Sequence, residues 1–188
     1  MDIKKALKLT AIGYLFTLVN FNLNFNGGTL NIMPEFIGWI LLFLAFDHYG
    51  DYGRGKQWLK WTALVLAVVF AAFWVINLMD SNMQNTTQFS TLKSAASLAS
   101  AVYSFFMFDI LETVAADISS SQTGRISFLK YFNAGIYVVM IALAFVAQPG
   151  NVQVIAWPIL IVGTAALVAA IITVIALFRL SKEAGRLG

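Results

Sequence analysis

Two places in the sequence hold side chains that could do acid–base or metal chemistry. The run Asp47-His48-Tyr49-Gly50-Asp51 brings two carboxylates next to the only histidine, and Asp109 and Glu112 lie one helical turn apart. Carboxylate oxygens in such groups can bind a divalent cation or a metal pair for phosphate transfer. The alternative is that these acidic groups form ion pairs with the lysines and arginines near them.

Ion pairing is the favoured interpretation, because no further catalytic pattern accompanies the carboxylates. The sequence contains no HExxH, no GxSxG and no glycine-rich phosphate loop, and it has a single histidine. The longer run of spaced aspartates typical of lipid-alcohol phosphotransferases is missing, and the lack of cysteine excludes thiolate sites and disulfides. We therefore predict no metal and no cofactor. The least favoured class is an intramembrane enzyme that uses Asp47, Asp51, Asp109 and Glu112.

A second polar segment could bind a ligand: VNFNLNFNGGTLNIMPEF, residues 19–36. Asparagines alternate with large apolar residues until Asn26-Gly27-Gly28, a pattern that by itself predicts a strand, a turn and a second strand. One interpretation is a tip between two helices, with asparagine caps at the outer interface of a membrane. The other is a recessed polar vestibule lined by Asn20, Asn22, Asn24, Asn31, Glu35 and Trp39.

The composition indicates that most of the chain faces lipid. Hydrophobic residues make up 60% of the 188 residues, charged residues make up 11%, and the mean hydropathy is +0.79. An average soluble domain has about 25% charged residues, so this chain has too few to cover a surface exposed to water. The net charge of +3 does not indicate a nucleic-acid partner, because the positions of the charges matter more than their sum.

The apolar runs predict an all-α, polytopic bundle of six transmembrane helices in one integral membrane domain, residues 1–188. A crossing helix needs ~20 residues, and the first two runs are near the lower limit. The N-terminal segment has no small-residue cleavage site before the chain becomes polar, so we expect a retained helix and not a signal peptide. The expected helices cover residues 8–25, 33–47, 58–79, 91–113, 126–147 and 152–180.

The positions of lysine and arginine predict the orientation in a cell (inner or plasma) membrane. If both termini are cytoplasmic, the outer loops hold only Lys93. The inner segments then hold eleven basic residues, a strong positive-inside asymmetry. These residues are Lys4, Lys5, Lys8, Arg54, Lys56, Lys60, Arg125, Lys130, Arg179, Lys182 and Arg186.

A weak internal repeat groups the helices into three hairpins. Leu7-Lys8-Leu9-Thr10-Ala11 is similar to Leu59-Lys60-Trp61-Thr62-Ala63 and, less closely, to Leu129-Lys130-Tyr131. From the entry lysine to the exit charge, the second and third hairpins span 49 residues each and the first spans 39. The pattern predicts a pseudo-threefold arrangement in which the first hairpin is shortened. The exit residues are Asp47, Asp109 and Arg179.

The shortened hairpin affects the asparagine segment. A helix from Lys8 to Val19 rises only about 17 Å, and one from Pro34 to Asp47 about 20 Å, against a hydrocarbon core of ~30 Å. Either the first helix continues through the asparagines or the chain unwinds below the outer surface. Both cases place asparagine amides inside the outer leaflet, where protein or a water-filled cavity must satisfy them.

Small residues at four-residue spacing mark two of the expected helices. Such faces allow helices to approach closely, either inside the bundle or against a partner subunit or a second copy of the chain. The residues are Ala96, Ser97, Ser100, Ala101, Ala165, Ala166, Ala169 and Ala170.

Two function classes are carried forward. The favoured one is a small membrane subunit that binds or transports a polar or amphipathic small molecule from the outer face; the alternative is a structural or regulatory subunit that docks another membrane protein. In size and number of expected helices the chain is similar to the substrate-binding subunits of energy-coupling-factor vitamin transporters, which is a similarity of architecture alone. The expected partners are membrane lipid, a membrane protein or a second copy of the chain, and no nucleic acid.

Overall fold

The computed structural model describes residues 2–18, 22–25, 28–31, 34–53, 55–79, 87–146 and 152–187. These residues form six α-helices, one short 3-10 helix and one two-stranded antiparallel hairpin. The elements in chain order are α1 (Ile3–Leu18), β1 (Asn22–Phe25), β2 (Gly28–Asn31), α2 (Glu35–Tyr49), η1 (Gly50–Gly53), α3 (Gln57–Met79), α4 (Thr87–Ile118), α5 (Ser120–Val146) and α6 (Val152–Leu187).

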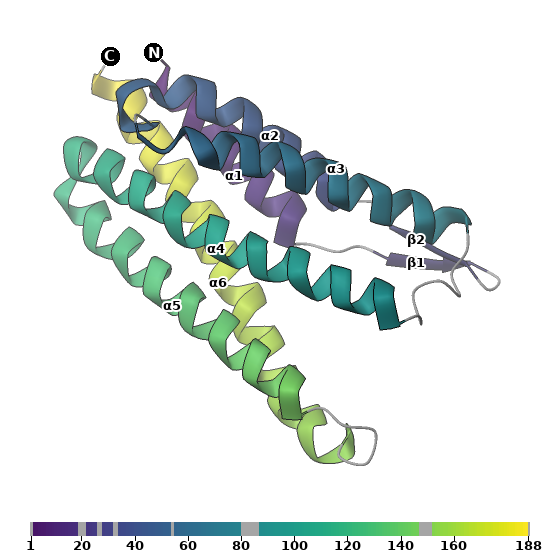
Figure 1. The fold of residues 1–188 in the computed structure, drawn as a ribbon. Coiled ribbons are helices and arrows are strands. Elements are labelled where there is room, and N and C mark those ends of the chain that lie inside the picture. The colour runs from purple at the N-terminus through teal and green to yellow at the C-terminus, as the bar shows by residue number, and fades with distance from the viewer. Residues whose placement is uncertain are drawn as a thin grey trace.

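Each helix packs against the next one in the chain, and α6 returns to pack against α1, which closes the bundle (Figure 1). Both termini lie at one end of the molecule, called here the terminal end. The β1–β2 hairpin lies at the opposite end, called here the hairpin end, with β2 against α3. Toward the hairpin end, α5 and α6 diverge from α3 and α4 (Figure 1).

Three helical segments of the described chain are long and apolar enough to cross a membrane: Gln57–Leu78, Thr91–Ile118 and Trp157–Arg186. Glu35–Phe46 is a shorter apolar helix. Less than half of the apolar part of each long segment is buried inside the protein, so large apolar side chains such as Val68 and Ile161 point outward. An outward apolar surface of this extent is typical of a protein surrounded by lipid.

The first helix was predicted over residues 8–25, and the structure places it at Ile3–Leu18. The asparagine segment forms the two predicted strands, in which Asn22 pairs with Asn31 and Asn24 with Thr29. The predicted turn at residues 26–27 lies outside the described residues. Asparagine is disfavoured inside helices because its side-chain amide competes for the backbone hydrogen bonds. The hairpin instead satisfies those backbone groups across the two strands.

The remaining helices begin or end outside the predicted limits, most of all α4, α5 and α6. Helix α6 ends at Leu187 and not at the predicted residue 180. The predicted helix 91–113 extends to Thr87–Ile118, and the predicted helix 126–147 begins at Ser120. Apolar runs mark only the lipid-facing part of a helix, whereas backbone hydrogen bonding continues through polar residues. Val114 and Ala115 are fully buried beyond the predicted end, so packing also favours the longer helix.

Two glycines let α1 and α2 cross in backbone contact. A Cβ atom at Gly38 would lie 2.6 Å from the carbonyl oxygen of Gly13 and 2.6 Å from Cγ2 of Thr17. Nearer the terminal end, the hydroxyls of Thr10 and Tyr49 form a buried 2.8 Å hydrogen bond between the same helices. The short first hairpin is therefore the most closely packed pair in the bundle.

Candidate functional site

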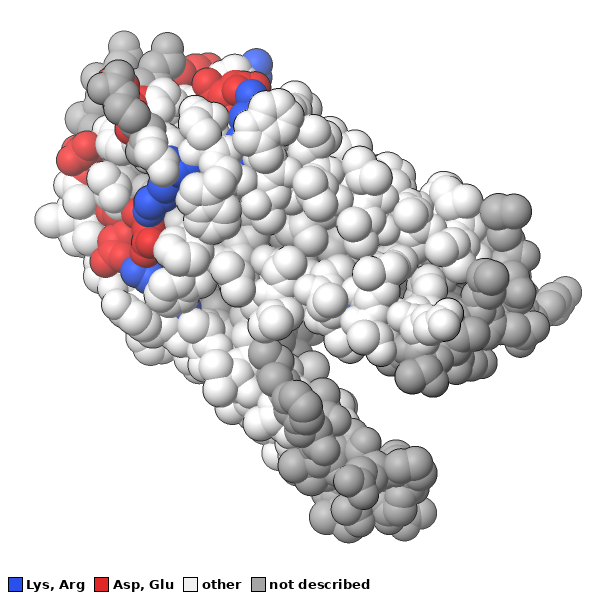
Figure 2. Space-filling view, viewed as in Figure 1, with Lys and Arg blue, Asp and Glu red and all other residues white. Residues whose placement is uncertain are grey.

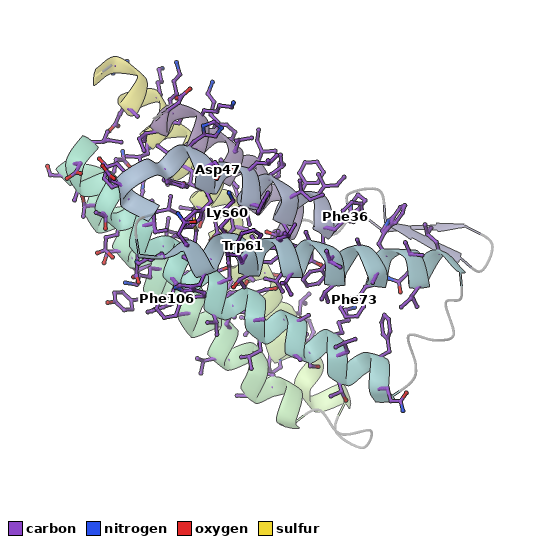
Figure 3. All side chains as sticks on the ribbon, turned by 45° about the horizontal axis from the view of Figure 1, so that its top comes forward. Phe36, Asp47, Lys60, Trp61, Phe73 and Phe106 are labelled. Atoms are coloured by element: carbon purple, nitrogen blue, oxygen red, sulfur yellow. The ribbon has the colours of Figure 1, made fainter. Side chains whose placement is uncertain are left out.

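Ion pairs join neighbouring helices at the terminal end. Asp47 on α2 pairs with Lys60 on α3, and the Lys60 Nζ lies 5.0 Å from the centre of the Phe43 ring. Figure 3 shows Asp47 and Lys60 on adjacent helices, with Trp61 next to Lys60 in the chain. Asp109 on α4 pairs with Lys130 on α5 at 2.5 Å, and the Lys130 Nζ lies 4.9 Å from the centre of the Phe105 ring.

Further contacts satisfy the remaining charges around Lys130. Glu112 lies 3.5 Å from the Lys130 Nζ, and Lys56 lies 3.4 Å from Asp109. The Tyr52 phenol in η1 forms a hydrogen bond with Asp117 in α4. This bond, together with partial burial, raises the pKa of the Tyr52 phenol. The carboxylates of Asp47, Asp109 and Glu112 are thus bonded to lysines, as the ion-pairing interpretation predicts, and no group of three metal-ligating side chains occurs in the described part of the chain.

At the hairpin end, the structure describes part of the predicted asparagine vestibule. Asn20 lies outside the described residues, and only the backbone of Asn22, Asn24 and Asn31 is described. The lining role of these amides therefore stays a prediction. Glu35 and Trp39 are both described, in the first two turns of α2.

Trp39 is held by aromatic rings and leaves one polar group unsatisfied. Its side chain is only 2% exposed; the ring stacks on Phe70 at 6.1 Å and meets the edge of Tyr103 at 5.1 Å. The indole N–H has no hydrogen-bond partner with good geometry among the described residues. The half-buried Glu35 carboxylate lies beside it, one turn earlier in α2. A buried donor without a partner loses its hydration without compensation.

A small polar cavity lies in the middle of the bundle. Its volume is about 10 Å³, and it is lined by side chains from α1, α4, α5 and α6: Tyr14, Ser104, Phe108, Asn133, Tyr137 and Thr173. The Asn133 amide and the Thr173 hydroxyl bond to carbonyls of their own helices, each at 2.8 Å. The Tyr14 hydroxyl is buried beside Ser104 but lacks a hydrogen bond with good geometry in the described chain. A cavity of this size and polarity can hold about one water molecule.

The cavity and the Trp39 region are close to each other. Tyr137, which lines the cavity, is close enough to Glu35 for an electrostatic interaction. Tyr103, which contacts the Trp39 ring, is similarly close to Tyr14. We call these residues, Glu35, Trp39, Tyr14, Ser104 and Tyr137, the interior polar cluster.

Figure 2 shows how the two ends differ on one face of the molecule. The visible lysine, arginine, aspartate and glutamate side chains gather at the terminal end. At the hairpin end a notch separates the ends of α5 and α6 from the rest of the protein, and it narrows toward the middle (Figures 1 and 2). Two residues of the interior polar cluster, Ser104 and Tyr137, come from α4 and α5, which diverge there, and the others come from α1 and α2.

The small-residue faces divide between interior and exterior. Four residues are buried: Ala96, Ser100, Ala169 and Ala170. Ser97 is exposed and bonds to the carbonyl of Lys93 in its own helix. The others, Ala101, Ala165 and Ala166, are half-buried. These faces contribute to packing within the bundle, and their use by a partner stays a prediction.

Sequence analysis did not identify this cavity, and four of its polar lining residues are Tyr14, Ser104, Tyr137 and Thr173. Each is a single polar residue within an apolar run. That is the signal that could have identified them, since isolated polar groups in a transmembrane helix tend to face the interior of the bundle.

The chain matches no protein-family model, no curated protein and no solved structure. Its function is therefore argued from its own site.

Proposed function

We propose that the chain is a multi-pass protein of the cell (inner or plasma) membrane whose six helices cross the bilayer with both termini in the cytoplasm. The three apolar segments support membrane insertion, and the charges at the terminal end support its cytoplasmic placement (Figure 2). At 16 and 15 residues, α1 and α2 are the shortest helices. They reach only about 24 and 22 Å, which puts the β1–β2 hairpin partly below the outer surface.

We propose further that the helices form three related hairpins. The support is the likeness of two ion pairs: Phe43 and Asp47 enclose Lys60 as Phe105 and Asp109 enclose Lys130. In each pair the aromatic residue precedes the aspartate by one helical turn, and the lysine begins the following hairpin. Chemically similar contacts at corresponding positions are expected of repeated units.

The function that the site supports best is binding, or transport, of a polar or amphipathic small molecule that enters from the outer face. The observation that carries this proposal is the presence of two buried polar groups that lack a hydrogen bond of good geometry. These groups are the Trp39 N–H beside Glu35 and the Tyr14 hydroxyl beside Ser104, at the central cavity. Buried polar groups in a bilayer must be satisfied, and a ligand's polar group can do so. Because the cavity has room for about one water, only that polar group enters, and the rest of the ligand lies in the notch.

A thermal-shift screen of small molecules against the full chain in detergent tests this function. We expect a stabilising compound whose effect is lost in Trp39→Phe and in Asn22→Leu. The control is Tyr131→Phe, which alters an exposed tyrosine that does not line the cavity. Stabilisation that persists in both site variants would exclude this recess as the binding site.

The alternative, a structural or regulatory subunit that docks another membrane protein, predicts a different result. A specific protein would then copurify with the chain and be lost on Ala166→Leu, because Ala166 is half-buried on one of the small-residue faces. Copurification that is lost on Ala166→Leu, without any ligand-dependent stabilisation, would favour this alternative over small-molecule binding.

A further inference from the structure

Three contacts in the bundle bring a returning helix against an outgoing helix at the terminal end: α2 with α3, α4 with α5, and α6 with α1. We call them the first, second and third seams. The first two each join an exit aspartate to an entry lysine. In the third seam the exit residue is Arg179 and the entry residue is Lys8, so two positive charges replace an ion pair.

The burial of neighbouring residues indicates that these positions correspond. The leucine before each entry lysine is almost completely buried, as is the residue two positions before each exit charge. Equivalent buried neighbours place each charged residue on the equivalent side of its helix. The buried residues are Leu7, Leu59 and Leu129, and Ala45, Met107 and Leu177.

The register of the third seam brings Lys8 and Arg179 to similar heights. The Ser181 hydroxyl donates a hydrogen bond to the Lys4 carbonyl oxygen at 3.1 Å. Because α1 and α6 run in opposite directions (Figure 1), the residues that follow Lys4 lie level with the residues that precede Ser181. Lys8, one turn after Lys4, and Arg179, within one turn before Ser181, therefore lie at similar heights. The side chain of Lys4 lies over Gly185, with its Nζ 3.1 Å from where a Cβ would be.

The third seam contains no acidic group that neutralises this pair. Lys8 and Arg179 are both exposed, and neither has an ion pair within the described residues. Of the acidic residues at these helix ends, Asp2 accepts the Lys5 backbone N–H at 3.0 Å, and Glu183 accepts from Gln122 at 3.3 Å. Two positive charges at similar heights on adjacent helices repel each other, so an anion from outside the chain would stabilise the seam.

We propose that the third seam binds the phosphate of an anionic membrane lipid. A phosphodiester accepts paired hydrogen bonds from an arginine and attracts the lysine. Ile12 and Ile175 lie four residues from Lys8 and Arg179, respectively, on the side toward the hairpin end. Both are exposed and apolar, so they provide a surface for an acyl chain. Position 175 corresponds to Phe43 and Phe105, which cover the lysines of the other seams. The inference needs the terminal end to lie at a membrane surface, but it does not need the outer binding recess.

The test measures binding of dioleoyl-phosphatidylglycerol to the delipidated full chain in detergent by native mass spectrometry. Phosphatidylcholine and inorganic phosphate are the comparison probes. We expect Arg179→Gln to weaken phosphatidylglycerol binding about tenfold, the equivalent of one charge-assisted contact of ~1.4 kcal/mol. Arg125→Gln, which removes an exposed arginine from α5 at the same end, is the matched control and should change binding by less than about twofold.

Arg179→Asp provides an independent check, because it places an aspartate opposite Lys8 as in the other two seams. This variant should lose phosphatidylglycerol binding and should unfold at a higher temperature than the lipid-free parent. Equal losses in Arg179→Gln and Arg125→Gln, equal binding of phosphatidylcholine, or equal occupancy by inorganic phosphate would each overturn the proposal. Ligand stabilisation at the outer recess should be unchanged in Arg179→Gln, so the two proposals can fail separately.

Discussion

The two ends of this protein satisfy their polar groups in different ways. At the terminal end, Asp47 and Asp109 are bonded to lysines from the next helix, and Thr10 is bonded to Tyr49. Toward the hairpin end, the Trp39 N–H and the Tyr14 hydroxyl are buried and lack a hydrogen bond of good geometry among the described residues. Regions that bind ligands are drawn from the less stable parts of a structure. The terminal end therefore contributes most of this polar stabilisation, and the proposed ligand site lies toward the middle and the hairpin end.

The largest effect on stability is expected at Gly38, where α1 and α2 are too close together for a larger side chain. Gly38→Ala places a methyl group 2.6 Å from the Gly13 carbonyl oxygen, so α1 and α2 must separate. We expect a loss of about 3 kcal/mol in the free energy of unfolding, measured by titration with sodium dodecyl sulfate in mixed micelles. The control is Gly135→Ala in α5, where a Cβ would contact nothing within 4 Å. Similar losses in both variants would show that the backbone contact is unimportant.

A smaller loss is expected from Asp109→Asn. Lys130 is only 10% exposed, and Glu112 at 3.5 Å compensates in part for the missing carboxylate. We expect a loss of about 2 kcal/mol, below the ~3–5 kcal/mol typical of a fully buried pair. Asp47→Asn removes the corresponding group of the first seam, but Asp47 is 54% exposed, so a loss of less than about 1 kcal/mol is expected. The same unfolding titration measures both variants, and the reverse order would contradict this ranking by burial.

Thr10→Val tests the hydrogen bond between Thr10 and Tyr49, which joins α1 to α2 near the terminal end. The substitution preserves the shape of the side chain and leaves the fully buried Tyr49 hydroxyl without its 2.8 Å partner. We expect a loss of about 1–2 kcal/mol in the same titration. The double variant with Tyr49→Phe should recover part of that loss, since it removes the unsatisfied group as well. A double variant no more stable than Thr10→Val would argue against the hydrogen bond as the cause.

Tyr14→Phe is expected to have the smallest effect on stability and to act in the opposite direction. It removes a buried hydroxyl that lacks a partner in the described chain, so the ligand-free protein should gain up to about 1 kcal/mol in the unfolding titration. The same variant should lose stabilisation by any compound found in the thermal-shift screen. A loss of stability comparable to that of Thr10→Val would mean that the hydroxyl is already satisfied, and the contrast between the two ends would not hold.

Much of the local structure could be predicted from residue types. The alternation of asparagines with apolar residues predicted the two strands, and the spacing of lysines and aspartates predicted ion pairing at one end. The end of the first helix was not predicted correctly. A run of apolar residues through Phe25 is compatible with a helix, and only pairing with residues 28–31 decides that residues 22–25 form a strand.

The sequence by itself determined that the chain is rich in long apolar helices and that its charges lie at their ends, because composition and length decide which segments can cross a bilayer. Only the tertiary structure decided that Tyr14, Ser104, Tyr137 and Thr173 meet at one cavity. In a membrane helix, the side facing lipid and the side facing other helices are both apolar, so periodicity does not reveal which side points inward. Close contacts such as Gly13 against Gly38 set the rotation of each helix, and that rotation selects the polar groups that come together.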